Sequence, residues 1–241
     1  MRCELIDSMG TDLTVVNAAR VSFNNESDWE EEKLGERDTK LINYLAKHNH
    51  WTPFSHVMVT MRETVPIFVA RQRFKHMVGF SYNEISRRYV DDEPKFYVPD
   101  VWRGKPENAK QGSSNVVIEI MTPWDDAEPN TVQWWYARWM EDAAFNYNAM
   151  LKAGVAPEQA RMVLPQSMYT SYYVTGSLAA WARAYKLRID PHAQKEIQDL
   201  AKQWGDIIGN IEGMKHSWTA LTSSPGDVCL VPFAGVGSEC V

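Results

Sequence analysis

The chain has 241 residues and a formal net charge of −6, and its composition is 44% hydrophobic and 23% charged. A chain of this length can bury one sizeable core, and the composition is ordinary for a soluble globular protein. The acidic balance argues against non-specific binding to nucleic acid, and no apolar run approaches the roughly 18 residues of a membrane span.

The N-terminus, MRCELIDSMGTDL, has no apolar signal-peptide core. The three cysteines, Cys3, Cys229 and Cys240, lie far apart and form no paired spacing. This spacing argues against a disulfide framework or a structural zinc site, and it indicates a reducing, cytoplasmic setting.

Strand and helix patterns alternate in the N-terminal third. Residues 2–9 are typical of a short strand, and residues 12–23 of a helix with Asp12 as its expected N-cap. An acidic loop over 24–38 leads to an amphipathic helix over 39–50. Residues 55–65 alternate as a strand does, and Pro66 then opens a helix that we expect to run to about Met77.

The remainder is richer in helix. Residues 103–130 contain many Gly, Pro, Asn and Ser residues and are expected to form an excursion loop. Helices are predicted over 132–154, 157–165 and 176–188, and a final helix is predicted to follow an Asp190–Pro191 cap. The core face of that final helix would comprise Ile197, Leu200, Ala201, Trp204, Ile207, Ile208 and Ile211. No linker precedes about residue 221, so we expect one domain over 1–220 and an extension over 221–241.

A basic segment stands out in this acidic chain. From Arg71 to Arg88, five basic residues stand against a single acid, Glu84. Helical spacing puts the pairs Arg71/Lys75 and Gln72/His76 side by side on one face. The segment then continues into Gly79 and several hydroxyl and amide side chains. An anionic ligand such as a phosphate would suit these donors, although an exposed basic helix face is the simpler alternative.

Two further groups are candidates. His48, His50 and His56 lie close in sequence, but no cysteine or nearby acid completes a metal-ligand set, so no metal site is expected. His50 remains a candidate for stacking or proton transfer. Arg161 and Arg188 stand at predicted helix ends, where a cation is ordinarily compatible with the helix dipole.

Several ordered blocks resemble the flavin-dependent thymidylate synthases of the ThyX family. The blocks are ELIDSMGTDLTVVNAARVSF, LAKHNHWTPFSHVMVTMRETVPIFVARQRFKH, SYNEISRRY, and the segment from ARMVLP through AQKEIQDLA. The resemblance extends over nearly the whole chain. It implies an α+β fold in which a mixed antiparallel sheet packs with several helices in a single domain.

The resemblance also implies an activity. Enzymes of this family bind FAD, reduce it with NADPH, and methylate dUMP to dTMP with 5,10-methylenetetrahydrofolate, as homotetramers with shared active sites. They use no cysteine nucleophile, and none of the resembling blocks contains a cysteine. A nucleotide- or RNA-binding module without catalysis is the alternative, which the acidic net charge disfavours.

Site residues follow by position from the resemblance. It implies that Arg188 activates the uracil electrostatically, with Ser86 and His50 as further catalytic residues. Residues implied in dUMP binding are Gln72, Arg73, Phe74, Lys75, Glu84, Ile85, Ser86, Arg87, Arg88, Arg161 and Arg188. Those implied in FAD binding are Thr52, Lys75, His76, Met77, Glu84, Ser177 and Arg183.

The chain departs from the family pattern on the flavin side. Lys75 and Met77 replace the two arginines of an Arg-His-Arg triplet, and eight residues rather than seven separate Met77 from Ser86. Ser177 and Arg183 stand where the family commonly has Asn, or His at the second position. The tail, PGDVCLVPFAGVGSECV, resembles the start of an S-adenosylmethionine-binding motif, but it is too short to form such a domain.

Overall fold

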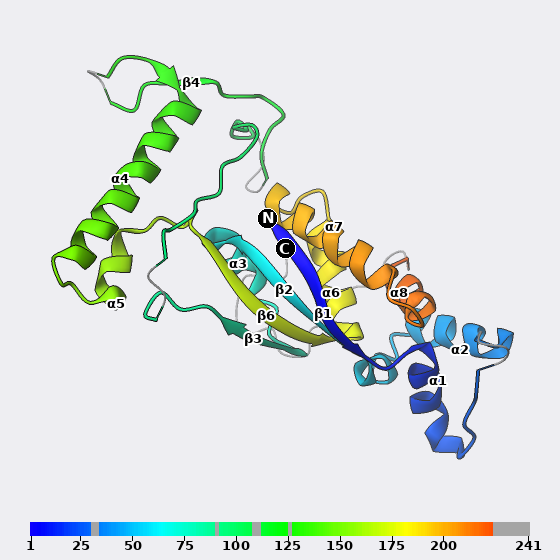
Figure 1. Ribbon diagram of the computed structural model, residues 1–241. Coiled ribbons are helices and arrows are strands. Elements are labelled where there is room, and N and C mark those ends of the chain that lie inside the picture. Colours follow the sequence, from blue (N-terminus) through cyan, green and yellow to red (C-terminus); the bar gives the residue numbers. More distant parts are fainter. Residues whose placement is uncertain (30–33, 90–91, 108–111, 125–126, 224–241) are drawn as a thin grey trace.

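The structure, a computed structural model, describes residues 1–29, 34–89, 92–107, 112–124 and 127–223. A four-stranded antiparallel sheet lies at its centre, in the order β1 (Arg2–Met9), β2 (Met58–Pro66), β6 (Tyr169–Ser177) and β3 (Phe80–Glu84). Figure 1 shows these strands side by side, with helices covering one face. The mixed helix and antiparallel-sheet fold expected from the sequence is confirmed.

The core lies between this sheet and two helices, α6 (Leu178–Ile189) and α7 (Lys195–Gly209). Side chains alternate along β2, so that Val59, Met61 and Val65 are fully buried while Arg62 is exposed. The core face predicted from the helical spacing is largely confirmed in α7. Ile207, and Ile211 just beyond the end of the helix, are only partly buried. The helix begins at the N-cap Gln194, four residues after the predicted Asp190 cap.

Three helices pack together at one end of the sheet: α1 (Asp12–Arg20), α2 (Glu36–Lys47) and α8 (Lys215–Thr222). The N-cap of α1 is Thr11, so the prediction for Asp12 was wrong. The buried Asp12 carboxylate instead accepts hydrogen bonds from the backbone N–H groups of His216 (3.1 Å) and Ser217 (2.8 Å) in the first turn of α8. Helix α8, which ends at Thr222, was not predicted from the sequence.

Helix α3 (Ile67–Arg73) is shorter than predicted and stops four residues before Met77. The chain then turns through Gly79, whose φ of +80° favours glycine. A Cβ at this position would lie 2.9 Å from the Ala180 Cβ, so a larger residue has no room there. After this turn the chain enters β3, a strand that was not predicted from the sequence of the basic segment.

The long excursion between β3 and β6 carries a helical arm. Within residues 103–130 the described part holds the short strand β4 (Ile120–Met121), which pairs with β5 (Asn130–Thr131). Helix α4 (Val132–Lys152) follows and projects away from the sheet, as Figure 1 shows. The chain returns to β6 through α5 (Pro157–Ala160) and the 3-10 turn η3 (Arg161–Val163). Two further 3-10 turns of the described chain, η1 (Val21–Phe23) and η2 (Pro53–His56), lie earlier in the sequence.

No helix in the described part of the chain is both long and apolar enough to cross a membrane. The tail that resembles an S-adenosylmethionine motif lies outside the described residues.

Candidate active site

A cavity of about 600 Å³ opens where β2 ends, β6 begins and β3 ends. Antiparallel order brings these three strand ends to the same edge of the sheet. The loop after β3 and the turn η3 close the remaining sides. The cavity is lined by Thr64, Ile67, Glu84, Ile85, Ser86, Arg87, Asp92, Glu93, Lys95, Arg161, Met162, Leu164, Met168, Tyr169, Thr170 and Ser171.

Five of the residues expected to hold dUMP meet in this cavity: Glu84, Ile85, Ser86, Arg87 and Arg161. Arg161 is separated from the other four by more than seventy positions in the sequence. The fold therefore gathers these two parts of the predicted set at one place.

Hydrogen bonds fix two acceptors at the cavity. The buried Thr170 hydroxyl donates to Glu84 Oε1 over 2.6 Å, which orients the carboxylate at the end of β3. Ser86 Oγ accepts from the backbone N–H of Arg88 over 3.3 Å, which makes a tight turn directly after the strand. The Arg88 side chain lies over the Tyr89 ring, 5.1 Å from its centroid, and Arg88 does not line the cavity.

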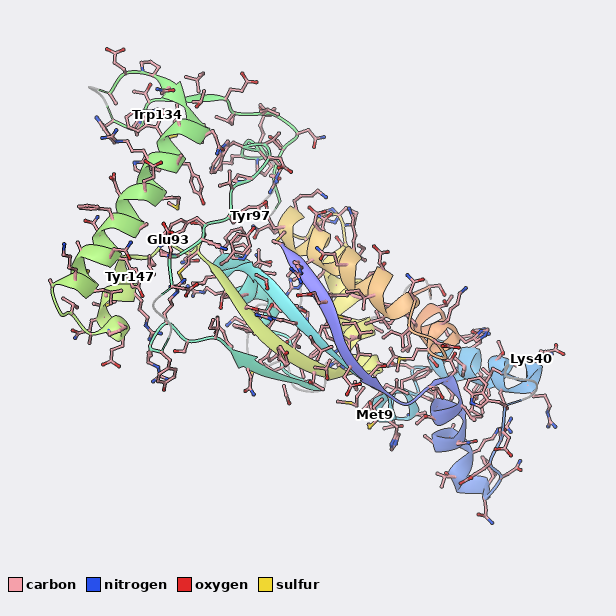
Figure 2. All side chains as sticks on the ribbon, viewed as in Figure 1. Met9, Lys40, Glu93, Tyr97, Trp134 and Tyr147 are labelled. Carbon is pink, nitrogen blue, oxygen red and sulfur yellow. The ribbon has the colours of Figure 1, made fainter. Side chains whose placement is uncertain are left out.

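Three cations border the cavity: Arg87, Lys95 and Arg161. Arg87 forms an ion pair with Asp92 at 3.2 Å and lies over the ring of the buried Tyr147, 5.9 Å from its centroid. Figure 2 places Tyr147 on α4, and Glu93 on the segment between that helix and the sheet. Guanidinium and ammonium groups of this kind are the donors that bind phosphate.

A second group of predicted residues lies elsewhere, around the C-terminal end of α3. His76 is 7% exposed, and its Nε2 accepts a hydrogen bond of 2.8 Å from Arg188 Nε at the end of α6. Burial, together with the positive charges of Arg188, Arg73 and Arg183, lowers the pKa of His76 to about 3. The imidazole is therefore neutral at pH 7, and since Nε2 accepts, Nδ1 carries the proton.

Gln72 and Arg183 belong to this second group. Gln72 Nε2 donates to Gln194 Oε1 at the start of α7. Arg183 Nη2 donates to the carbonyl of Val78 over 2.5 Å, which ties the Met77–Gly79 turn to α6. None of the four residues Gln72, His76, Arg183 and Arg188 lines the cavity of the described chain.

Arg73, which the resemblance placed among the dUMP-binding residues, is a core residue and does not line the cavity. The side chain is fully buried, forms an ion pair with the fully buried Glu63 at 3.2 Å, and donates to the Tyr82 hydroxyl over 2.5 Å. Its guanidinium also lies over the rings of Phe80 and Trp181, 4.4 and 4.7 Å from their centroids. A ligand cannot reach this group without opening the core.

The other predicted residues are dispersed. Phe74 packs against Tyr172 and Tyr82 with ring centroids 4.8 and 5.1 Å apart, while Lys75 and Met77 are exposed next to the Met77–Gly79 turn. Ser177 is buried and its hydroxyl accepts from the N–H of Ala180 (3.2 Å) as the N-cap of α6. His50 and Thr52 are exposed near the end of α2, and neither lines the cavity.

Sequence reasoning missed several cavity residues, above all Thr170, Ser171 and Lys95. Thr170 and Ser171 belong to β6, whose run YTSYYVTGS is rich in β-branched and aromatic residues. That composition is the signal that would have identified the strand. Lys95 carries no such signal, because its position depends on how the loop after β3 returns to β6.

No group of three or more His, Cys, Asp or Glu residues suited to a metal occurs among the described residues. Cys3 is the one cysteine that the structure describes, and it lies on β1, outside the cavity. Burial raises the pKa of its thiol far above the ordinary value. A thiolate nucleophile from Cys3 is therefore unsuited to chemistry in this cavity.

Comparisons with known proteins agree on one family. The family model described as "Thymidylate synthase complementing protein" matches residues 4–211. Flavin-dependent thymidylate synthases of Thermosipho africanus and Thermotoga neapolitana are each 39% identical to this chain. The matches cover 89% and 90% of this chain and 87% of each relative.

A solved structure agrees with the sequence matches. The UMP/dUMP methylase PolB from Streptomyces cacaoi, bound with 5-Br dUMP, matches with a TM-score of 0.73 and 31% identity. The match covers 92% of this chain and 94% of that one. The structure of the same protein bound with 5-Br UMP gives the same values.

Proposed function

The chain belongs to the flavin-dependent thymidylate synthase family, and on that premise we propose that it methylates dUMP reductively to dTMP. The methylene group would come from 5,10-methylenetetrahydrofolate, and the reducing equivalents from NADPH. Bound FAD would supply the hydride to the transferred carbon. No cysteine attack on the uracil is needed.

The observation that carries this proposal is the convergence at the cavity. Glu84, Ser86 and Arg87 meet Arg161 there, although the two segments are far apart in sequence. A volume of about 600 Å³ is within the ordinary range for small-molecule sites. Arg87 and Arg161 supply charge-assisted donors for the nucleotide phosphate, and the oriented Glu84 carboxylate accepts from a donor group of the nucleotide.

The residues around the Met77–Gly79 turn fit a dinucleotide cofactor. Lys75 and Arg183 provide cations for a pyrophosphate, and the glycine turn lets the backbone approach a ligand closely. The turn is fixed to α6 by the Arg183–Val78 hydrogen bond. Thr52, His76 and Ser177 complete the set expected to hold FAD, with Ser177 engaged as a helix cap.

Arg188 is the residue that we propose acts on the pyrimidine. The neutral His76 ring accepts from Arg188 Nε, which orients the guanidinium at the end of α6. A fixed and permanently charged donor stabilises negative charge on the uracil ring without reorganising during the reaction.

We also propose that the chain assembles as a homotetramer with shared sites. Arg188 and Gln72 do not line the cavity that holds Glu84, Ser86 and Arg161, so a complete site would combine groups from two copies. The projecting α4 exposes Trp134, Trp139 and Phe145, an apolar surface suited to contact with another chain.

The activity is tested by incubating the purified protein with FAD, NADPH, 5,10-methylenetetrahydrofolate and dUMP, and by following product mass. We expect dTMP whose methyl carbon derives from labelled methylenetetrahydrofolate. A parallel reaction with UMP shows whether the chain shares the substrate range in the name of the Streptomyces cacaoi protein. Absence of both products, with the protein folded and FAD present, would contradict the proposal.

A further inference from the structure

Gln72 is the first member of a hydrogen-bonded chain that reaches across three parts of the molecule. Gln72 Nε2 on α3 donates to Gln194 Oε1. Gln194 Nε2 donates to Glu196 Oε2 over 2.8 Å. Glu196 Oε1 in turn forms an ion pair of 2.5 Å with Arg103 Nη2 from the excursion. Nothing in the sequence pattern singled out Gln194, Glu196 or Arg103.

The donor and acceptor groups of these side chains determine which way each hydrogen bond in the series points. The Glu196 carboxylate is paired with Arg103 and offers only acceptor atoms to its other neighbour. Gln194 must therefore turn its NH₂ group toward Glu196, which leaves its carbonyl oxygen facing Gln72. Gln72 must then meet that oxygen with its own NH₂ group, and its carbonyl oxygen remains as the acceptor for a ligand. An inverted amide would place two acceptors together at one of these contacts.

Neighbouring contacts also hold the hydrogen-bonded side chains in place. Gln194 is the N-cap of α7, and its backbone carbonyl accepts from the N–H groups of Ile197 (3.1 Å) and Gln198 (3.0 Å). Glu196 is 5% exposed, so water competes little for its oxygens. Arg103 is anchored by a 2.8 Å hydrogen bond from its Nε to Ser113 Oγ. The amide of Gln72 is thus oriented by groups that lack freedom to rearrange.

We propose that Gln194 and Glu196 are positioning residues that fix the Gln72 carbonyl oxygen as the acceptor for an N–H or O–H donor of the pyrimidine nucleotide. This inference rests on the proposed function, in which Gln72 contacts dUMP. The donor is either the imide N3–H of the base or the 3′-hydroxyl of the sugar. Neither Gln194 nor Glu196 touches the nucleotide, because both act through Gln72.

The test is a double-mutant cycle on dUMP affinity, measured by titration calorimetry of the purified protein with FAD supplied. Glu196→Gln lets Gln194 and then Gln72 invert, and we expect dUMP binding to weaken about three- to tenfold, as for one misplaced hydrogen bond. In a Gln72→Ala background the same substitution should change dUMP affinity by less than twofold, because the group it orients is gone. A control, Asp199→Asn, removes the partner of Lys195 on the outer side of α7 and should leave affinity unchanged.

A second variant keeps the test valid if Glu196→Gln fails to fold. Gln194→Ala breaks the chain while keeping the Glu196–Arg103 ion pair, and it should reproduce the loss seen with Glu196→Gln. Titration with 2′,3′-dideoxyuridine monophosphate separates the two donors, since the loss disappears with this ligand only if the 3′-hydroxyl is the group bound.

Equal losses from Glu196→Gln in the wild-type and Gln72→Ala backgrounds would overturn the proposal, because they would indicate a merely structural role. Unchanged dUMP affinity in the folded Gln194→Ala variant would overturn it as well. If Gln72→Ala binds dUMP as tightly as the wild type, this inference fails while the proposed function stands. If the wild type binds no dUMP, the proposed function fails first and this inference with it.

Discussion

At the scale of single residues, the contact between His76 and Arg188 determines how both behave. The guanidinium is oriented by the buried imidazole, and burial together with the charge of Arg188 keeps that imidazole neutral. Two predictions follow from this contact, one on turnover and one on the pH dependence of stability.

Arg188→Ala should lower turnover on the order of a hundredfold or more, because one fixed donor to developing charge is lost. Arg188→Lys should rescue only in part, since an ammonium group has no planar fork and cannot keep the Nε contact with His76. The measurement is dUMP-dependent oxidation of the reduced flavin, with the melting temperature recorded in parallel. A near-normal oxidation rate together with a lowered melting temperature would assign Arg188 a structural role.

His76 should make the native state less stable as the pH falls. Its pKa is about 3 in the folded protein and about 6.5 when unfolded, so between these values the unfolded state binds the extra proton. The free energy of unfolding therefore falls below pH 6.5, by up to about 1.4 kcal/mol per pH unit from this group. His76→Gln, which keeps an acceptor for Arg188 but does not titrate, should show a shallower decline between pH 6.5 and 5 in denaturant titrations. Identical slopes for the two proteins would show that His76 is not buried in its neutral form.

At the scale of elements, the buried Arg73–Glu63 pair joins α3 to β2, and the Tyr82 hydroxyl adds β3 to the same cluster. The Tyr172 hydroxyl donates to the second Glu63 oxygen, so β6 belongs to it as well. Helix α3 and the three strands whose ends open into the cavity therefore meet at one buried ion pair.

Arg73→Met should lower the free energy of unfolding by about 3–5 kcal/mol, because it leaves the Glu63 carboxylate buried without its counter-charge. Arg71→Ala is the matched control: Arg71 lies on the same helix but is exposed, and its loss should cost less than about 0.5 kcal/mol. Urea unfolding measures both. If Arg73→Met lowers the free energy of unfolding only slightly but weakens dUMP binding, Arg73 acts in ligand binding rather than in the core.

Local sequence patterns predicted the elements whose signals are local. The alternation of β2 and the helical spacing of α7 both appear in the structure, because burial on one face imposes them. The pairing of β6 between β2 and β3 depends on contacts between residues 88 to 119 positions apart, and no local pattern encodes it. The early end of α3 has a similar cause, since the Gly79 turn must fit against α6.

At the scale of the whole molecule, the sequence named candidate site residues but could not predict how they are distributed in space. Glu84, Ser86, Arg87 and Arg161 meet at the cavity as the resemblance implied they should, whereas Arg188 lies in a separate group. Arg73 could not be distinguished from its exposed neighbour Arg71 by residue type, because only the packing of Phe80, Tyr82 and Trp181 around it shows its role.

If the active site is shared between copies, two inactive variants should complement each other. Arg161→Ala disables the cavity and Arg188→Ala disables the second group, so each variant alone should be nearly inactive. Hybrids formed by mixing the two under mild denaturation and refolding contain some sites in which both groups are intact. We expect activity in the mixture to rise well above the sum of the separate variants, with each variant refolded alone as the control. If the activity of the mixture equals the sum of the activities of the two variants, each complete site lies within one chain.

The central claim, reductive methylation of dUMP through a flavin, is tested most directly by the visible absorption spectrum of the protein with FAD, reduced anaerobically. We predict that dUMP and 5,10-methylenetetrahydrofolate together restore the oxidised flavin spectrum and yield one equivalent of dTMP per flavin reoxidised, while neither compound alone does so. A folded protein that takes up no FAD, or whose reduced flavin is unaffected by the two substrates together, would contradict the account.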